Sequence, residues 1–225
     1  IIMVGLGCFY PAIDATAGER ERSTWETLMT VSASRSSVLI AKYLYVATMG
    51  IVAGLLNVVA MIASLGVLLA PLAGGEALPS FRLPLASVPV LLVGAIGLAL
   101  FFAAAMMILA SFARTFKDGQ AMVTPVYYLA LMPIFMGQSF DRRLTFELAL
   151  IPIVNVTQMM RDALQGAISW PLTALTLAVL LALVVLCLIV ARQILRYEDH
   201  MLGTYDGSFW RFMRERMLPG RRTAK

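Results

Sequence analysis

The sequence predicts an all-α protein, a polytopic bundle of about five membrane-spanning helices, and three observations carry this prediction. Of the 225 residues, 60% are hydrophobic and only 14% are charged, whereas about 25% are charged in an ordinary soluble domain. The charges are clustered, so that four stretches of 22 to 33 residues contain no ionisable side chain of the Asp, Glu, Lys, Arg or His type. Because roughly 20 apolar residues cross the hydrocarbon layer as a helix, each stretch is long enough to span. These stretches are residues 43–75, 83–113, 119–140 and 163–191.

A fifth apolar run opens the chain at residues 1–13. It is too short to span, and no basic residues precede it as they would in a signal peptide. We therefore expect the chain to begin inside a membrane helix. The domain organisation that follows is one membrane domain over residues 1–198 and a basic tail over residues 199–225.

The basic residues predict the orientation, because Lys and Arg in short loops stay on the cytoplasmic side. Of the 18 Lys and Arg residues, 14 fall in the connections after the first and third runs and in residues 192–225, after the last run. We therefore expect a multi-pass protein of a bacterial-type plasma (inner) membrane with a cytoplasmic C-terminus. Residues 192–225 also carry four acidic residues, which argues against nucleic acid as their partner. They are Glu198, Asp199, Asp206 and Glu215.

The residue inventory argues against an enzyme. His200 is the single histidine, and Cys8 and Cys187 both lie inside apolar runs, so neither a His-based triad nor a metal-ligand set is predicted. The sequence also lacks the GxxxxGK[ST] phosphate loop. We expect no cofactor or metal bound by this chain and no ATP hydrolysis of its own.

Within the spans, small residues and prolines recur at informative spacings. Gly50 and Gly54 have the four-residue step that lets membrane helices approach closely, although glycine is also simply frequent in such helices. Residues Ala95, Ala99 and Ala103 repeat that step in the next run. The fourth run contains Pro125 and Pro133, each of which removes a backbone donor, so this helix is predicted to be kinked or broken.

Three polar side chains interrupt otherwise aliphatic runs and are the candidate pathway residues. Such groups are expected to face the protein interior, where hydrogen-bond partners are available. They are Asn57, Tyr127 and Tyr128.

The segment before the last span predicts an interfacial or re-entrant helix pair at the outer face. A short apolar piece containing Pro152 is followed by a helical pattern that Gly166 ends. At its polar side, Arg161 and Asp162 are either anchors that reach the lipid headgroups or contacts to a transported solute. With Asn155, these two residues form the candidate set in this segment.

The connection between the first two spans predicts an amphipathic cytoplasmic helix. Thr16 and Glu19 have the spacing of a capping box, so the helix is expected to begin near Ala17. One face is apolar and the other carries charges of both signs, which favours a protein partner over a lipid surface. The candidate contact residues are Glu19, Arg20, Glu21, Arg22, Trp25, Glu26, Leu28 and Met29.

The same connection, AGERERSTWETLMTVSASRSSVLIAKYL, closely resembles a signature of type-2 ABC transporter permeases, especially the NatB-type sodium-extrusion group. The resemblance continues through SFARTFKDGQAMVTP and IPIVNVTQMMRDALQG, in the family's order, and covers the chain to about residue 198. Ser23 and Ser32 stand where the family usually has Gly and Pro. The resemblance implies five of six membrane helices here, with the first helix and an extracytoplasmic domain preceding them.

The resemblance also implies a division of labour between subunits. This chain is expected to form the membrane path of an ATP-driven exporter, with residues 19–29 as a coupling helix. A separate ATPase subunit would hold ATP and Mg²⁺, and a second permease copy or half would complete the path. A gradient-driven secondary transporter or channel is the alternative, because it too can contain a Pro-interrupted helix. The solute is left open among sodium, drugs, peptides and lipids.

Overall fold

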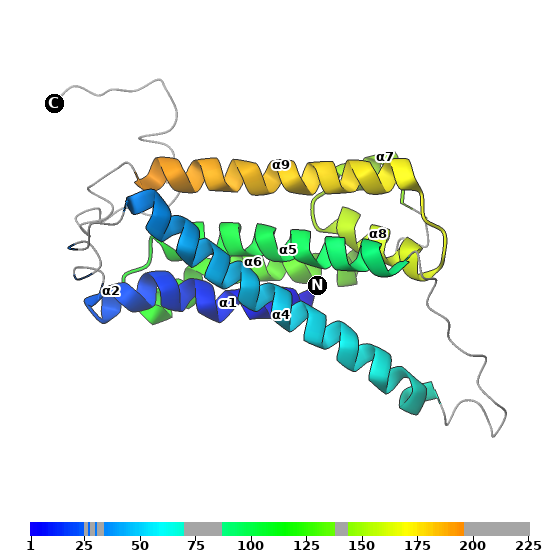
Figure 1. The fold of residues 1–225 in the computed structure, drawn as a ribbon, viewed down its shortest axis with the longest axis horizontal. Coiled ribbons are helices and arrows are strands. Elements are labelled where there is room, and N and C mark those ends of the chain that lie inside the picture. Colours follow the sequence, from blue (N-terminus) through cyan, green and yellow to red (C-terminus); the bar gives the residue numbers. More distant parts are fainter. Residues whose placement is uncertain (25–26, 28–29, 31–33, 70–86, 138–143, 196–225) are drawn as a thin grey trace.

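In the computed structural model, the described residues are 1–24, 27, 30, 34–69, 87–137 and 144–195. Most of these residues are helical, with no strand among them, which confirms the all-α prediction (Figure 1). The elements are α1 (Ile2–Ile13), the π-helical turn η1 (Asp14–Gly18), α2 (Glu19–Glu21), α4 (Arg35–Leu69), α5 (Ser87–Ala110), α6 (Phe116–Gly137), α7 (Phe146–Leu150), α8 (Val154–Leu164) and α9 (Trp170–Leu195).

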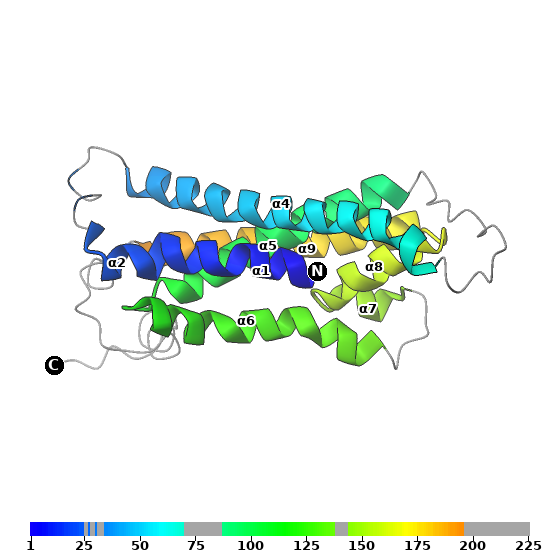
Figure 2. The same cartoon turned by 90° about the horizontal axis from the view of Figure 1, so that it is seen from below.

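Helix α5 forms the centre of the bundle. It contacts α1, α4, α6, α8 and α9, and Figure 2 shows it among the other long helices. Its sequence is apolar on every side, as is typical of a helix enclosed by other helices. Leu98, Ala99, Phe102 and Ala103 are completely buried. The other helices are therefore positioned chiefly by how they pack on α5.

Helices α1 and α4 cross closely through glycines. A Cβ atom placed on Gly7 would lie 2.5 Å from the Cβ of Ala53, and one placed on Gly54 would lie 2.6 Å from a methyl group of Val4. Gly50 faces Cys8 in the same crossing. The four-residue glycine step thus serves close packing, as the sequence predicts.

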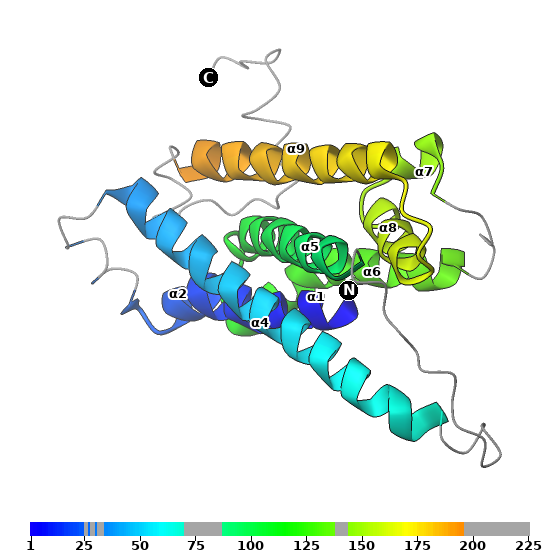
Figure 3. The same ribbon diagram turned by 45° about the vertical axis from the view of Figure 1, so that its right-hand side comes forward.

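Three described helices are long and apolar enough to cross a membrane, over Ser36–Ala60, Ser87–Ala110 and Trp170–Gln193. Helices α1 and α6, which correspond to the first and fourth expected spans, are outside this set, and α1 has 12 residues. The count of five spans therefore stays a prediction. The later part of α4 projects away from the other helices (Figure 3).

The fourth run is predicted to be kinked or broken; it is not broken, and a kink stays a prediction. Helix α6 is continuous from Phe116 to Gly137 and contains both Pro125 and Pro133. Just before the first proline, the Thr124 hydroxyl donates to the carbonyl of Gln120 at 2.6 Å. Membrane helices tolerate proline where neighbouring groups and local adjustments satisfy the freed backbone carbonyl, so two prolines are compatible with an unbroken helix.

The predicted short helix pair is present as α7 and α8. They are joined at Ile153, whose φ of 71° is unusual for a β-branched residue, and Gly166 follows α8 with a φ of 73°. The apolar side of α8 packs on α5, because a Cβ on Gly94 would lie 2.9 Å from the terminal methyl groups of both Met159 and Met160. This pair lies at the end of the bundle opposite to α2 (Figure 1).

Candidate functional site

The charged segment is a continuation of the first helix. Helix α1 runs through η1 into α2, and the chain turns at Ser23, where φ is 57°. The predicted capping box is therefore wrong: Thr16 lies inside the helical run, and its hydroxyl donates to the carbonyl of Ala12 at 2.6 Å. Inside a continuing helix, the backbone N–H groups that a cap would bond already donate to carbonyls of the preceding turn.

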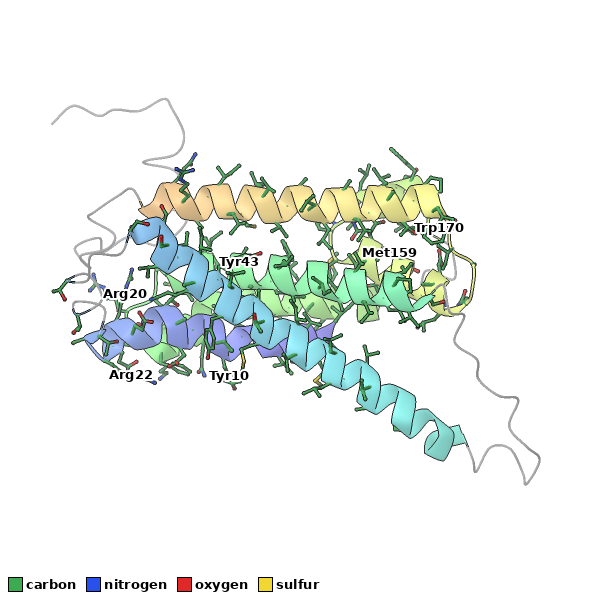
Figure 4. All side chains as sticks on the ribbon, viewed as in Figure 1. Tyr10, Arg20, Arg22, Tyr43, Met159 and Trp170 are labelled. Atoms are coloured by element: carbon green, nitrogen blue, oxygen red, sulfur yellow. The ribbon has the colours of Figure 1, made fainter. Side chains whose placement is uncertain are left out.

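Three consecutive charged residues in α2 reach three different elements. Glu19 pairs with Lys42 of α4. Arg20 donates to the carbonyl of Ala113, just after α5, at 3.4 Å. Glu21 accepts the backbone N–H of Phe116, the first residue of α6, at 2.6 Å. We call residues Asp14, Glu19, Arg20, Glu21, Arg22 and Lys42 the charged cluster, and this end of the molecule the charged end (Figure 4).

The Glu19–Lys42 pair is the most shielded part of the charged cluster. The side chains of Lys42 and Glu19 are 13% and 29% exposed. The Lys42 ammonium also donates to the carbonyl of Ala15, at 2.8 Å. Burial, and then the positive charge of Arg114, lower the pKa of the nearby Arg20 guanidinium. An arginine nevertheless stays charged at physiological pH, so this end of the bundle keeps its cation.

Glu21 supports the start of α6. Its carboxylate meets the first N–H of that helix, where the helix dipole favours negative charge. Thr115 adds a second cap, since its hydroxyl oxygen accepts the N–H of Asp118 at 3.2 Å. A side chain of the charged segment therefore holds the beginning of another long helix.

Two segments far apart in sequence make direct contact here. A Cβ placed on Gly119 of α6 would lie 2.7 Å from a methyl group of Ile13 and 3.2 Å from the Cβ of Ala17. Only glycine therefore allows α6 to approach η1 this closely. The stretches AGERER and SFARTFKDGQ thus form one structural unit at the charged end.

Arg22 differs from its neighbours because it pairs within its own segment. Its guanidinium lies 2.9 Å from Asp14, and the two side chains are 66% and 45% exposed. Of the other predicted contact residues, Trp25, Glu26, Leu28 and Met29 lie outside the described residues. The amphipathic helix expected over residues 19–29 is thus described only at its beginning.

The three candidate pathway residues do not share one environment. Asn57 and Tyr128 are exposed on this chain, so its own helices do not enclose them. Tyr127 is partly buried, and its ring packs edge to face with that of Phe9, with the ring centroids 6.0 Å apart. Whether the three residues act in transport stays a prediction.

The α8 end, which we define as α7, α8 and the adjoining ends of α5 and α9, buries its polar groups. The Asn155 amide donates to the carbonyl of Ala149 at 3.0 Å, and its oxygen accepts the N–H of Val156 at 2.7 Å. Asp162 is 5% exposed and accepts the N–H of Leu144 at 2.9 Å. The reading of Asp162 as a headgroup anchor is therefore wrong; Arg161 beside it is partly buried.

Sequence reasoning missed two residues that the structure places among these polar groups. Lys42 is absent from the predicted contact residues, although it is the basic residue directly before the uncharged run of residues 43–75. Gln158 lies between Asn155 and Asp162 on one side of α8 and is 3% exposed. The spacing of three and four residues could have shown that these polar side chains share a helix face.

These features define the class of protein: a multi-pass helical membrane protein with a charged segment at one end that links several helices. No group of three or more His, Cys, Asp or Glu side chains that could hold a metal ion occurs in the described part of the chain. The model of the ABC-2 family transporter proteins matches residues 2–215. The chain therefore belongs to the ABC-2 transporter family.

A curated relative points the same way. The chain is 27% identical over 177 residues to the ABC transporter permease protein NatB of Bacillus subtilis (strain 168). The matched region covers 76% of this chain and 45% of that protein, so the chain spans less than half the length of this relative. No solved structure matches the chain.

Proposed function

We propose that this chain is the membrane-spanning subunit of an ATP-driven exporter, and that a separate ATPase subunit docks on residues 19–29 at the charged end. One observation carries the proposal: Glu19, Arg20 and Glu21 connect this segment to α4, to the end of α5 and to the start of α6. A force applied there reaches three parts of the bundle at once. A permease needs such a connection if the motion of a partner subunit is to rearrange the helices that form the path through the membrane.

The remaining parts of the complex follow from the same proposal. The charged end faces the cytoplasm, as the distribution of Lys and Arg favours. ATP and Mg²⁺ bind the ATPase subunit, and a second permease copy or half completes the path. Asn57 and Tyr128, exposed on this chain, then face that path or the second copy, because polar groups within a bilayer require partners.

The nature of the solute rests on resemblance alone. Sodium is the first candidate because the motif at the charged end resembles the sodium-extrusion group, and drugs or lipids are also compatible with these apolar helices. The gradient-driven alternative loses its main sequence support, because α6 is a continuous helix despite its two prolines.

The proposal is tested with a tagged permease expressed together with its ATPase subunit. If Trp25 fills a pocket on the ATPase, Trp25→Ala lowers the affinity about 5- to 30-fold, corresponding to roughly 1–2 kcal/mol. Trp25→Phe keeps much of the apolar contact and should lose less. The measurements are co-purification and vanadate-sensitive ATP hydrolysis stimulated by the permease.

The matched control is Trp170→Ala, because Trp170 is 63% exposed at the opposite end of the bundle. This variant should retain ATPase binding. Equal binding by the Trp25→Ala and parent proteins would remove the docking role of residues 19–29. Absence of any nucleotide-hydrolysing partner would remove the ATP-driven function itself.

A further inference from the structure

Lys42 links two helices through two different groups of one segment. Its ammonium donates to the carbonyl of Ala15 in η1 at 2.8 Å and pairs with the carboxylate of Glu19 in α2. The two contacts lie four residues apart, so they hold the segment at two successive points. A surface ion pair between long side chains would hold it only loosely, but this lysine side chain is 13% exposed.

The backbone at this point departs from the ordinary helix. Residues Asp14–Gly18 form a π-helical turn, and the N–H of Glu19 donates to the carbonyl of Thr16. The carbonyl of Ala15 is directed to Lys42. Single π-helical turns inside α-helices are frequent at functional sites. A side chain from α4 therefore contacts the most irregular part of the charged segment.

A second point of attachment lies farther along α4. There α4 crosses α1 through Gly7, Gly50 and Gly54. Helix α4 also packs on α5 in this region, where the Tyr43 hydroxyl donates to the carbonyl of Leu100 at 3.2 Å, but that contact does not attach α4 to the charged segment. Lys42 makes that attachment, and a contact away from the crossing constrains the angle between α4 and the α1–α2 helix. Lys42 is eight residues before Gly50, about 12 Å along the helix axis. Leu69, the last residue of α4, lies about 28 Å beyond Gly50 on the same scale.

We propose that Lys42 is a positioning residue that fixes the angle between α4 and the α1–α2 helix, so that a displacement of the charged segment turns α4 about its glycine crossing. This inference rests on the proposed function in one respect, namely that an ATPase supplies the displacement. A movement at Lys42 would be enlarged about twofold at the far end of α4, given the two lengths along the helix. That far end is the part of α4 that projects from the bundle (Figure 3).

The test uses the permease–ATPase complex in lipid nanodiscs, with spin labels on Ser23→Cys and Leu56→Cys and with Cys8 and Cys187 replaced by Ala. Ser23 lies just after α2, and Leu56, which is 65% exposed, lies on α4 beyond the crossing. Electron–electron distance distributions are recorded without nucleotide and after trapping with MgATP and vanadate. The parent should give a narrow distribution that shifts on trapping.

Lys42→Met should at least double the width of the nucleotide-free distribution and abolish the shift, while the ATPase subunit still co-purifies. Lys42→Arg, which retains a cation and several donors, should preserve most of both properties. Glu19→Gln should give an intermediate width. The matched control is Asp14→Asn, which weakens the Arg22–Asp14 pair from outside residues 19–29; this pair stays within one segment and is far more exposed.

An unchanged width and shift in Lys42→Met would overturn the positioning role, as would equal broadening in Asp14→Asn. If Lys42→Met does not fold, Glu19→Gln decides by the same two measurements. The nucleotide-free width is also measured on the permease alone. If the unsubstituted permease binds no ATPase, the proposed function is contradicted. The width of the nucleotide-free distance distribution still tests the role of Lys42 in that case.

Discussion

The two ends of the bundle handle polar groups in opposite ways. At the charged end, long side chains reach from one element to another, as from Glu19 to Lys42, and several remain open to solvent. At the α8 end, Asn155 and Asp162 are at least 95% buried and are held by backbone groups within 18 residues in sequence. Opening a contact at the charged end lets water replace the partner. Breaking a hydrogen bond at the α8 end leaves a buried polar group without a partner, which costs much more free energy.

This difference separates a region suited to movement from a region suited to rigidity. Sub-global opening is easiest where few buried apolar groups and many exposed hydrogen bonds hold a segment. The Arg22–Asp14 pair at the charged end fits that description. The α8 end instead packs Met159 and Val156 against α5 around its polar groups. We therefore expect substitutions at the α8 end to lower stability and substitutions at the charged end to alter coupling.

The largest loss of stability is expected for Asn155→Leu. This change removes the donor to Ala149 and the acceptor for Val156, leaving two buried backbone groups without partners. The expected cost is about 2–4 kcal/mol of unfolding free energy. The measurement is reversible unfolding in mixed detergent micelles followed by circular dichroism.

The control for that experiment is Asn57→Leu, the same substitution at an exposed position of α4. Its unfolding free energy should stay within about 0.5 kcal/mol of the parent value. Similar losses at both positions would contradict the contrast between a satisfied buried amide and an exposed one.

A slightly smaller effect is expected for Asp162→Leu. The N–H of Leu144, now bonded to the carboxylate at 2.9 Å, would lose its acceptor in a buried position. Hydrogen bonds to charged groups contribute about 1.5–3 kcal/mol, and the unfolding free energy should fall by that amount. Asp162→Asn keeps a carbonyl oxygen and should lose less. If the leucine variant is as stable as the asparagine variant, this hydrogen bond does not stabilise the α8 end.

At the charged end, Glu21→Ala should cost about 1 kcal/mol, the usual value for losing a helix cap. Its most specific sign is local: the amide of Phe116 loses its acceptor, so its hydrogen exchange should accelerate. Thr115 continues to serve the amide of Asp118, whose exchange should change little. Equal acceleration at both amides would indicate general fraying of α6 instead.

The smallest effect on stability is expected for Arg22→Met. Because the pair with Asp14 is largely exposed, its loss should change the unfolding free energy by no more than about 0.5–1 kcal/mol, and by less at high salt. The measurement is the same unfolding experiment at two salt concentrations. A loss as large as that of Asn155→Leu would erase the contrast between the two ends.

The sequence predicted the elements better than their connections. Uncharged stretches located α4, α5 and α9, and the four-residue glycine step indicated close helix packing, which the structure shows where α1 and α4 cross. The capping box at Thr16 failed because a local pattern cannot show that a helix is already running through it. For Pro125 and Pro133 the sequence left a kink or a break open, and the helix is not broken, because groups around a proline decide whether the helix continues.

At the candidate site, the sequence identified the charged segment but not what its charges contact. Glu19 and Glu21 point to α4 and α6, and both partners lie more than twenty residues away. Charge patterning along one helix carries no information on which distant helix begins beside it. The positive φ of Ile153 could not be predicted from the sequence either, because a β-branched residue type rarely adopts it.

The central claim, that the charged end receives the ATPase subunit, is tested most directly by site-specific photocrosslinking in native membranes. A photoreactive residue at Ser23 probes the exposed turn after α2, and one at Gln165 probes the exposed end of α8. The account predicts a crosslink from Ser23 to a protein that contains a nucleotide-binding phosphate loop, and none from Gln165. A crosslink to that protein from Gln165 alone would contradict it.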